Sequence, residues 1–421
     1  MTAPPLDPRA RDDFPLAAAD RCVKCGLCLP HCPTYRLAEA EAESPRGRIA
    51  LLQGLVAGDI PLTERTREHL DNCLLCRACE RACPADVPYG AVMDAGRALY
   101  AAGRPDRRAI LWRNHLLTHP RRLASAVTLA WLAQRGGLVR LARAGGLTAL
   151  LRIEDAAALL PALQRPRGWP RHVPAQDEER GRVTLFLGCI ARHTDARALR
   201  LALRVLPALG FAVDIPVEAR CCGALDAHAG LTARAATLAA ENRRLFPDGT
   251  VIHLATACGA HLRETLADPV TGEAPTVVEL TRFLADIDWP VAPATLNDAG
   301  GGSLRVRGHL PCSARNALRD DTAIRDLMAR LPGVAYEELP GNDRCCGASG
   351  TYMLDHPETA RTLRADKVAA ADGGWLLTTN PGCALHLGAG LRERRAGPAV
   401  AHPVELVARA LGLRDGRLSN P

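Results

Sequence analysis

Sixteen cysteines in a chain of 421 residues constrain this sequence more than any other feature. The segment from Met1 to Phe14 carries Pro, Asp and Arg but no apolar run, so we expect no secretory signal and no export. No stretch reaches the roughly 20 apolar residues of a membrane helix. Thiols that stay in a reducing compartment rarely form disulfides. The cysteine count therefore favours metal centres with thiolate ligands, in a protein that we expect to be cytoplasmic.

The remaining composition is that of a globular chain with an apolar core. Apolar types make up 48% of the residues and charged types 24%, and a formal net charge of +7 is small for this length. Aromatic residues make up only 4%, which leaves few side chains on which bases could stack. We therefore predict no nucleic-acid partner.

Eight cysteines form two identical runs, C-x2-C-x2-C-x3-C-P, at residues 22–33 and 73–84. This is the bacterial ferredoxin spacing, in which the fourth cysteine of each run ligates the cluster of the other run. A zinc ribbon pairs two CxxC knuckles and has no triple runs that end in CP. We therefore predict two [4Fe–4S] clusters. The first is assigned to Cys22, Cys25, Cys28 and Cys83, and the second to Cys73, Cys76, Cys79 and Cys32.

A helix is predicted between the two runs. Ser44-Pro45 has the pattern of a helix start, and apolar residues recur at helical spacing from Ile49 onwards. Arg46 and Arg48 fall in the first turn of this helix. Positive charge beside a cluster would raise its reduction potential. A solvated first turn is nevertheless the favoured interpretation of these two arginines.

The other eight cysteines form a second duplication, whose copies are 123, 124 and 125 residues apart at successive cysteines. Each copy has one cysteine, then a Cys-Cys-Gly triplet, then a last cysteine with a histidine three residues beyond it. Adjacent cysteines fit one tetrahedral ion poorly because their side chains diverge, so two metals or two irons of one cluster are favoured. The candidate ligands are Cys189, Cys221, Cys222, Cys258 and His261 in the first copy, and Cys312, Cys345, Cys346, Cys383 and His386 in the second.

Strand-like stretches precede most of these cysteines, and amphipathic helical segments alternate with the strands. The strand-like stretches are 183–187, 211–215, 251–255, 304–306 and 375–379, and the helical segments include 195–209, 231–245 and 357–371. Such alternation predicts a parallel sheet, and the loops beyond the carboxyl ends of its strands are where such sheets bind ligands. We therefore predict a multidomain α+β fold. It consists of a helical ferredoxin-type dicluster domain over 1–104, a helical connector over 105–180, and two duplicated α/β cysteine-rich domains over 181–296 and 303–421.

With these motifs the chain resembles the iron–sulfur subunits of the glycolate oxidase, anaerobic glycerol-3-phosphate dehydrogenase and heterodisulfide reductase group. Within that group, the amino-acid sequence of these motifs is most similar to the glycolate oxidase iron–sulfur subunit family. The matching stretches include Cys22-Val-Lys-Cys-Gly-Leu-Cys, Pro45-Arg-Gly-Arg-Ile and Cys345-Cys-Gly-Ala-Ser-Gly-Thr-Tyr. The resemblance covers nearly the whole chain and is weakest from about Arg104 to Arg180.

The resemblance implies the electron-transfer subunit of an oxidoreductase complex. An FAD-linked oxidase subunit would oxidise glycolate or another 2-hydroxy acid, and this chain would pass the electrons towards a quinone. A peripheral location on the inner face of the cell membrane is an alternative to a free cytoplasmic one. The chain carries no motif for holding a flavin or NAD itself, and no catalytic residue is assigned. The group's Cys-Cys-Gly pattern ends in CxxC, whereas His261 and His386 stand there in this chain, which leaves open whether these sites hold a cluster or another metal.

Three other functions stay open at this point. One is the equivalent subunit of a glycerol-3-phosphate or lactate dehydrogenase. A second is a heterodisulfide-reductase-like enzyme with catalysis at the Cys-Cys-Gly sites, against which the missing last cysteine weighs. The third is a structural zinc protein. The apolar helices near Leu123 to Leu160 are expected to pack against a partner subunit.

Overall fold

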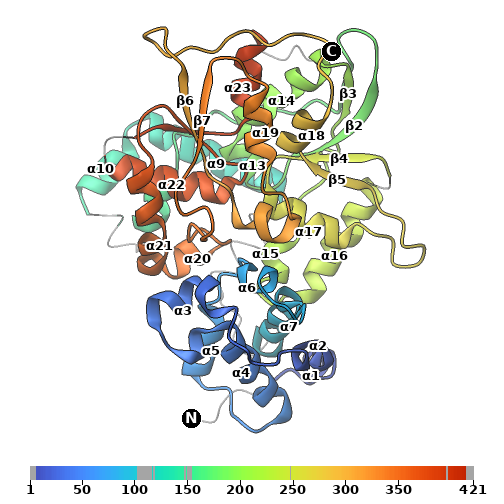
Figure 1. The fold of residues 1–421 in the computed structure, drawn as a ribbon, viewed down its shortest axis with the longest axis vertical. Coiled ribbons are helices and arrows are strands. Elements are labelled where there is room, and N and C mark those ends of the chain that lie inside the picture. Colours follow the sequence, from blue (N-terminus) through green and yellow to red (C-terminus); the bar gives the residue numbers. More distant parts are fainter. Residues whose placement is uncertain are drawn as a thin grey trace.

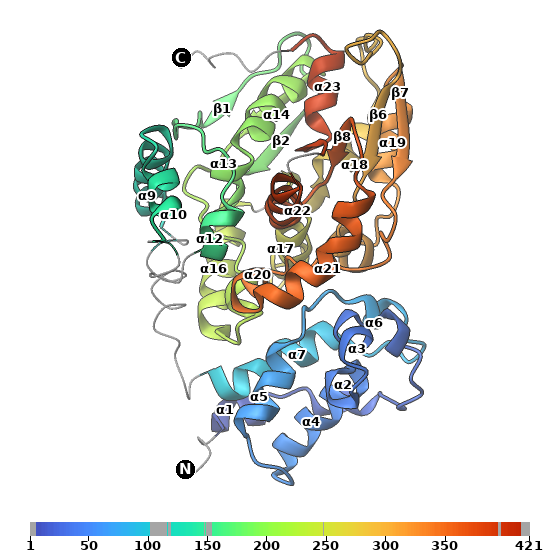
Figure 2. The ribbon, with the colours of Figure 1, turned by 90° about the vertical axis from the view of Figure 1, so that its left-hand side faces the viewer.

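The computed structural model describes residues 6–101, 116, 119–146, 148, 154–246, 248–394 and 397–413. Figure 1 shows the N-terminal helices, in blue, gathered at one end of the molecule and the α/β part at the other. Figure 2 shows the same separation after a 90° turn. None of the described helices is long and apolar enough to span a membrane. The predicted domain limits stay predictions, and the one at residue 104 lies outside the described ranges.

Short helices make up the N-terminal region. The predicted helix start is confirmed, because Ser44 Oγ accepts a hydrogen bond from Gly47 N at 2.9 Å and Pro45 is the first helical residue. Leu52 and Leu99 are fully buried where two of these helices pack together. The helices are α1 (Pro8–Asp12), α2 (Leu16–Asp20), α3 (Pro33–Ala38), α4 (Pro45–Ala57), α5 (Glu64–Asp71), α6 (Ala78–Arg81) and α7 (Tyr89–Ala101), with 3-10 turns at Leu29–His31 and Glu41–Glu43.

The predicted connector contains three described helices and one strand. The helices are α9 (Pro120–Arg135), α10 (Leu138–Ala144) and α12 (Glu154–Leu159). The strand β1 (His172–Val173) pairs antiparallel with β3 of the first sheet, which brings His172 opposite Asp214. Residues near the end of the predicted connector therefore pair with the first sheet.

Two parallel sheets with the same strand order form the α/β part. The first sheet has the order β1-β3-β2-β4-β5 and the second β7-β6-β8-β9, so in each copy the first strand lies between the second and the third. All pairs except β1 with β3 are parallel. This repeated order confirms that the cysteine duplication is a duplication of α/β units.

The elements of the first α/β unit are β2 (Gly181–Phe186), α13 (Ala191–Thr194), α14 (Ala196–Ala208), β3 (Phe211–Asp214), α15 (Ala224–Ala227), α16 (Thr232–Leu245), β4 (Thr250–His253), α17 (Thr256–Thr265), β5 (Thr276–Glu279) and α18 (Leu280–Asp286). Those of the second α/β unit are β6 (Leu304–Gly308), a π-helix (Ser313–Leu318), α19 (Ala323–Ala329), β7 (Val334–Glu338), α20 (Tyr352–Asp355), α21 (Pro357–Ala370), β8 (Trp375–Leu377), α22 (Pro381–Glu393), β9 (Ala399–Ala401) and α23 (Val404–Ala410).

The two α/β units share one apolar core. Helix α14 packs on α23 and α18 packs on α19, so that Leu199 and Leu203 of the first unit join Leu406 and Val407 of the second in one buried cluster. Each such side chain stabilises the fold by about 1.5–3 kcal/mol through apolar burial. The two α/β units are therefore joined by a common core, whereas the N-terminal helices have an apolar core of their own.

Candidate iron–sulfur and metal sites

The four cysteines predicted for the second cluster lie together. Cys32, Cys73, Cys76 and Cys79 all line one small cavity of about 20 Å³ in the N-terminal region. Burial and the neighbouring thiols raise the pKa of Cys76 and of Cys79 well above the ordinary value. Four thiols crowded into a dry space repel one another once ionised, and bound iron would supply the positive charge that offsets this. The donor set therefore fits a [4Fe–4S] cluster.

Both cysteine runs fold into the same kind of loop. The residues two positions beyond Cys22 and Cys73, Lys24 and Leu75, have φ values of 57° and 50°. A left-handed residue also follows the second cysteine of each run, Gly26 at 86° and Arg77 at 56°. A non-glycine residue in the left-handed backbone conformation costs about 1–2 kcal/mol, and the second loop has two such residues. Tertiary contacts must therefore stabilise this loop. One such contact is the ion pair of Arg77 with Glu264 of α17.

The cysteines predicted for the first cluster lie nearer the surface. Cys22, Cys28 and Cys83 border the apolar core of the N-terminal region, and Cys25 is exposed. Burial raises the pKa of Cys28 to about 11. The two sets therefore differ in environment, because three of the four cysteines in the second set are buried, whereas the first set is partly open to solvent.

Arg48 corrects one sequence interpretation, because its side chain is buried and not solvated. Its guanidinium donates to the Glu43 carboxylate at 2.5 Å and to Thr34 Oγ1 at 3.0 Å. The same group lies 4.0 Å from Cys32 Sγ. No local pattern indicated this burial, because Thr34 lies in α3 and only the tertiary fold brings it next to Arg48. A positive charge is thus held beside a thiol of the second set.

Arg46, in contrast, is partly exposed and connects α4 to the first cysteine loop. Its guanidinium donates to the carbonyl oxygen of Lys24 at 2.8 Å and pairs with Glu41 at 2.7 Å. Pairing with Glu41 raises the pKa of Arg46, so the arginine stays charged beside the loop. Its neighbour Gly26 leaves space for this contact, since a Cβ there would lie 2.9 Å from Arg46 Nη1.

In each α/β unit, the cysteines lie beyond the carboxyl ends of the strands, which confirms the predicted placement. We call Cys189, Cys221, Cys222 and Cys258 the first cup, and Cys312, Cys345, Cys346 and Cys383 the second cup. The triplet glycines Gly223 and Gly347 have φ values of 97° and 88°, which explains why glycine follows each cysteine pair.

In the first cup, the sulfurs of Cys189 and Cys221 lie 3.6 Å apart. His261 is buried on α17, and its Nε2 has no hydrogen-bond partner among the described residues. A Cβ on Gly223 would lie 3.2 Å from this nitrogen, so His261 lies against the Cys-Cys-Gly turn. Burial lowers the pKa of His261, which favours a neutral imidazole.

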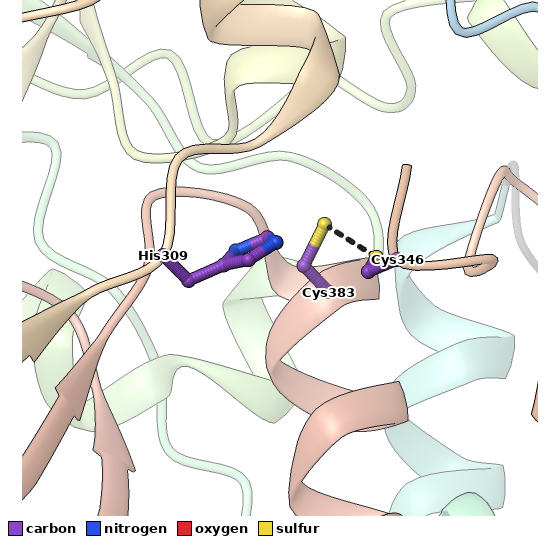
Figure 3. A group of neighbouring side chains, drawn as sticks. All are labelled: His309, Cys346 and Cys383. Atoms are coloured by element: carbon purple, nitrogen blue, oxygen red, sulfur yellow. Dashed lines mark hydrogen bonds between the residues drawn. The ribbon is translucent and has the colours of Figure 1, made fainter. Parts of the chain in front are cut away.

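In the second cup, Cys346 and Cys383 have sulfurs 3.2 Å apart, and Cys312 and Cys345 have sulfurs 3.9 Å apart. The imidazole that shares a close group of donors with Cys346 and Cys383 is His309, as Figure 3 shows. The predicted His386 instead uses Nε2 to donate to the carbonyl oxygen of Ala360 at 3.0 Å.

Sequence reasoning missed His309 because it relied on what the two copies share. His309 comes three residues before Cys312, and the residue three before Cys189 is Phe186. A comparison of the two copies could have identified His309, because a histidine near an aligned cysteine replaces a phenylalanine of the first copy.

The second cup also faces the N-terminal region. Cys76 lines a cavity of about 110 Å³ together with all four cysteines of the second cup and with His261. Asn316 donates to the carbonyl oxygen of Cys76 at 2.7 Å, and Ser349 Oγ donates to that of Leu74. The loop of the second cysteine set therefore lies directly against the second cup.

Comparisons with known proteins agree with this organisation. A family described as "4Fe-4S dicluster domain" matches residues 18–87, and one described as "Cysteine-rich domain" matches residues 183–263 and 306–388. A third, "Glycolate oxidase iron-sulfur subunit, linker region", matches residues 107–160. The matches confirm the predicted fold class, a dicluster region followed by two cysteine-rich α/β units.

Similar proteins extend over almost the whole chain. The "Glycolate oxidase iron-sulfur subunit" of Escherichia coli is 31% identical over 93% of this chain and 93% of its own length. The "Probable glycolate oxidase iron-sulfur subunit" of Bacillus subtilis is also 31% identical, over 93% of this chain and 94% of its own length. The "Lactate utilization protein A" of Oceanobacillus iheyensis is 24% identical over 54% of this chain and 96% of its own length.

Proposed function

Because the chain belongs to the family of glycolate oxidase iron–sulfur subunits, we propose that it is the electron-transfer subunit of a 2-hydroxy acid oxidase complex. An FAD-linked partner subunit oxidises glycolate or a related acid, and this chain passes the electrons towards a quinone. Two [4Fe–4S] clusters, when bound, supply the one-electron chemistry. Cys22, Cys25, Cys28 and Cys83 hold the first, and Cys73, Cys76, Cys79 and Cys32 hold the second.

The observation that carries this proposal is the cavity lined by Cys32, Cys73, Cys76 and Cys79. These side chains come from both runs, as the crossed ligand pattern of dicluster proteins requires. The buried Arg48 also lines this cavity. A dry pocket with a fixed positive charge suits a centre that accepts an electron, because it favours the more negative reduced state.

The exposed first cysteine loop supports an exchange of electrons with another protein. Val23 and Leu27, on either side of Cys25, are 70% and 57% exposed. Exposed apolar side chains that surround a redox ligand are suited to a docking surface. We propose that this loop faces a redox partner, while the second set faces the second cup.

A second exposed apolar surface lies on α9 and α10, where the sequence predicted contact with a partner. Leu129, Leu132, Leu138 and Leu141 are each more than half exposed there. We propose that this surface binds the FAD-linked subunit in a cytoplasmic complex.

The proposed function is tested by mixing the anaerobically purified chain with an FAD-linked oxidase subunit from the same organism. Addition of glycolate should bleach the visible absorption of the iron–sulfur centres, while omission of the flavoprotein should abolish the bleaching. Lactate and glycerol 3-phosphate serve as parallel substrates, because a lactate utilization protein is among the relatives. Bleaching by glycolate without any flavoprotein, or by none of the three substrates with it, contradicts the proposal.

A heterodisulfide-reductase-like activity is the alternative that the same preparation tests. A disulfide added to the reduced chain alone should stay intact, because the last cysteine of the full motif is replaced by histidine in both copies. Reduction of the disulfide by the chain without the flavoprotein would favour the alternative, in which the cysteine cups are catalytic.

A further inference from the structure

The two α/β units share their fold but not the donor atoms around their cups. Phe186 of the first unit packs edge-on against Phe246, with ring centroids 5.9 Å apart. The corresponding residue of the second unit, three positions before Cys312, is His309. The cup of the second unit therefore contains a nitrogen donor where the first unit has an apolar ring.

His309 has the arrangement of a metal-binding imidazole. It is 1% exposed, and its Nδ1 lies 2.9 Å from Thr378 Oγ1. Its Nε2 is buried and has no hydrogen-bond partner within the described part of the chain. A proton on Nδ1, donated to Thr378, leaves the Nε2 lone pair free. Metal-bound histidines commonly use the second ring nitrogen in this way, to fix tautomer and orientation.

The spacing of the neighbouring thiols fits one ion better than a four-iron cubane. His309, Cys346 and Cys383 each offer a donor atom, and these atoms lie within 4.8 Å of one another. The two sulfurs are 3.2 Å apart, whereas the edge of a tetrahedron built from Zn–S bonds of about 2.3 Å is about 3.8 Å. The sulfurs of Cys346 and Cys383 would therefore need to separate by only about 0.6 Å to bind one ion. A cubane binds its cysteines on separate irons, which lie further apart.

We propose that the second α/β unit binds a single thiophilic divalent metal ion, Zn²⁺ or Fe²⁺, through His309 Nε2 and the thiolates of Cys346 and Cys383. Two thiolates and a neutral imidazole balance the charge of a divalent ion, which makes a buried site acceptable. Three protein ligands leave a fourth position for a water, and Cys346 and Cys383 line the cavity of about 110 Å³ that has room for one.

The position of His386 supports the choice of His309. His386 donates through Nε2 to the backbone of α21 and does not belong to the close group of donors. His386→Phe is therefore a matched control for His309→Phe, because both substitutions remove a buried imidazole from the same unit. His309→Phe also introduces the residue type that the first unit already carries at the corresponding position.

The test measures metal binding directly on the full chain with its iron–sulfur centres in place. The anaerobic protein is treated with EDTA until metal analysis is constant while the visible absorption is retained, and it is then titrated with Co²⁺. The wild type should bind one Co²⁺ with the d–d bands of a tetrahedral thiolate site. We expect His309→Phe to weaken binding by at least about ten-fold and His386→Phe to change it by less than about two-fold.

The contradicting outcomes are equally definite. Wild-type binding in His309→Phe, an equal loss in His386→Phe, or no Co²⁺ bound by the wild type would overturn the proposal. So would four extra irons with matching sulfide at the second cup. Circular dichroism checks that the variants are folded, and His309→Gln replaces His309→Phe if the latter is not. X-ray absorption of the Co²⁺-loaded wild type gives a separate reading, since a spectrum without imidazole scattering also contradicts the assignment.

Discussion

Replacing Arg48 with methionine tests whether a buried ion pair holds the N-terminal region together around Cys32. The guanidinium donates to the Glu43 carboxylate at 2.5 Å, to the Glu43 carbonyl at 2.6 Å and to the His69 carbonyl at 2.7 Å. Its removal leaves the 6%-exposed Glu43 without its cation. Breaking a buried pair from one side costs about 3–5 kcal/mol. Because His69 Nδ1 and Asn72 Nδ2 still contact Glu43 Oε1, we expect a loss at the lower end of this range. The free energy of unfolding should fall by about 3 kcal/mol.

The assay is anaerobic urea unfolding, followed by circular dichroism and by the visible absorption of the iron–sulfur centres. At a slope of about 2 kcal/mol/M, the loss lowers the unfolding midpoint by about 1.5 M. Arg46→Met is the control, because solvent screens its pair with the half-exposed Glu41, which therefore contributes little to stability. The double variant Arg48→Met/Glu43→Gln removes the stranded charge and should lose less than Arg48→Met alone. An Arg48→Met midpoint equal to that of Arg46→Met would refute the reasoning.

Two further predictions concern docking and pH. Arg81→Ala removes contacts with the Asp321 carboxylate at 2.6 and 2.7 Å and with the Arg315 carbonyl at 2.6 Å. Since this pair is partly exposed, we expect the substitution to lower the local stability of α6 by about 1 kcal/mol. Amide hydrogen exchange in α6 should then be roughly five-fold faster, and an unchanged exchange rate would contradict the contribution of this contact. Burial lowers the pKa of His253 to about 4 from 6.5, so the unfolded chain takes up a proton first and stability falls as pH drops from about 6.5 towards 4. His253→Gln should reduce this loss in the free energy of unfolding by up to about 3 kcal/mol. An equally steep loss of stability with falling pH in the variant would contradict the role of His253.

The parts of this fold that were predictable are those with local sequence signals. Strands β2, β3, β4, β6 and β8 and helices α14, α16 and α21 all lie where apolar patterning indicated them. Strands β1 and β5 of the first sheet were not predicted, and neither were β7 and β9 of the second sheet. Strand β7, Val334–Glu338, is largely exposed and ends in two glutamates, and β9, Ala399–Ala401, is only three residues long. Both lie at the edges of the second sheet, where hydrophobic patterning is weakest.

The grouping of the N-terminal cysteines was predictable because both runs repeat a known spacing. That spacing predicted that Cys32 would lie with Cys73, Cys76 and Cys79, and these four residues line one cavity. The burial of Arg48 and the position of His309 were not predictable in this way. Arg48 contacts Thr34 of α3 and the backbone of His69 in α5, and His309 lies near cysteines that are 37 and 74 residues away in the chain. Only the closed tertiary structure brings these groups into contact.

A reductive titration of the anaerobically purified chain tests the central claim most directly. If the eight N-terminal thiolates hold two [4Fe–4S] centres, the protein is brown, contains about eight cluster irons, and loses visible absorption on uptake of about two electrons per chain. A colourless chain that keeps all sixteen thiols intact and takes up no electrons would contradict the account.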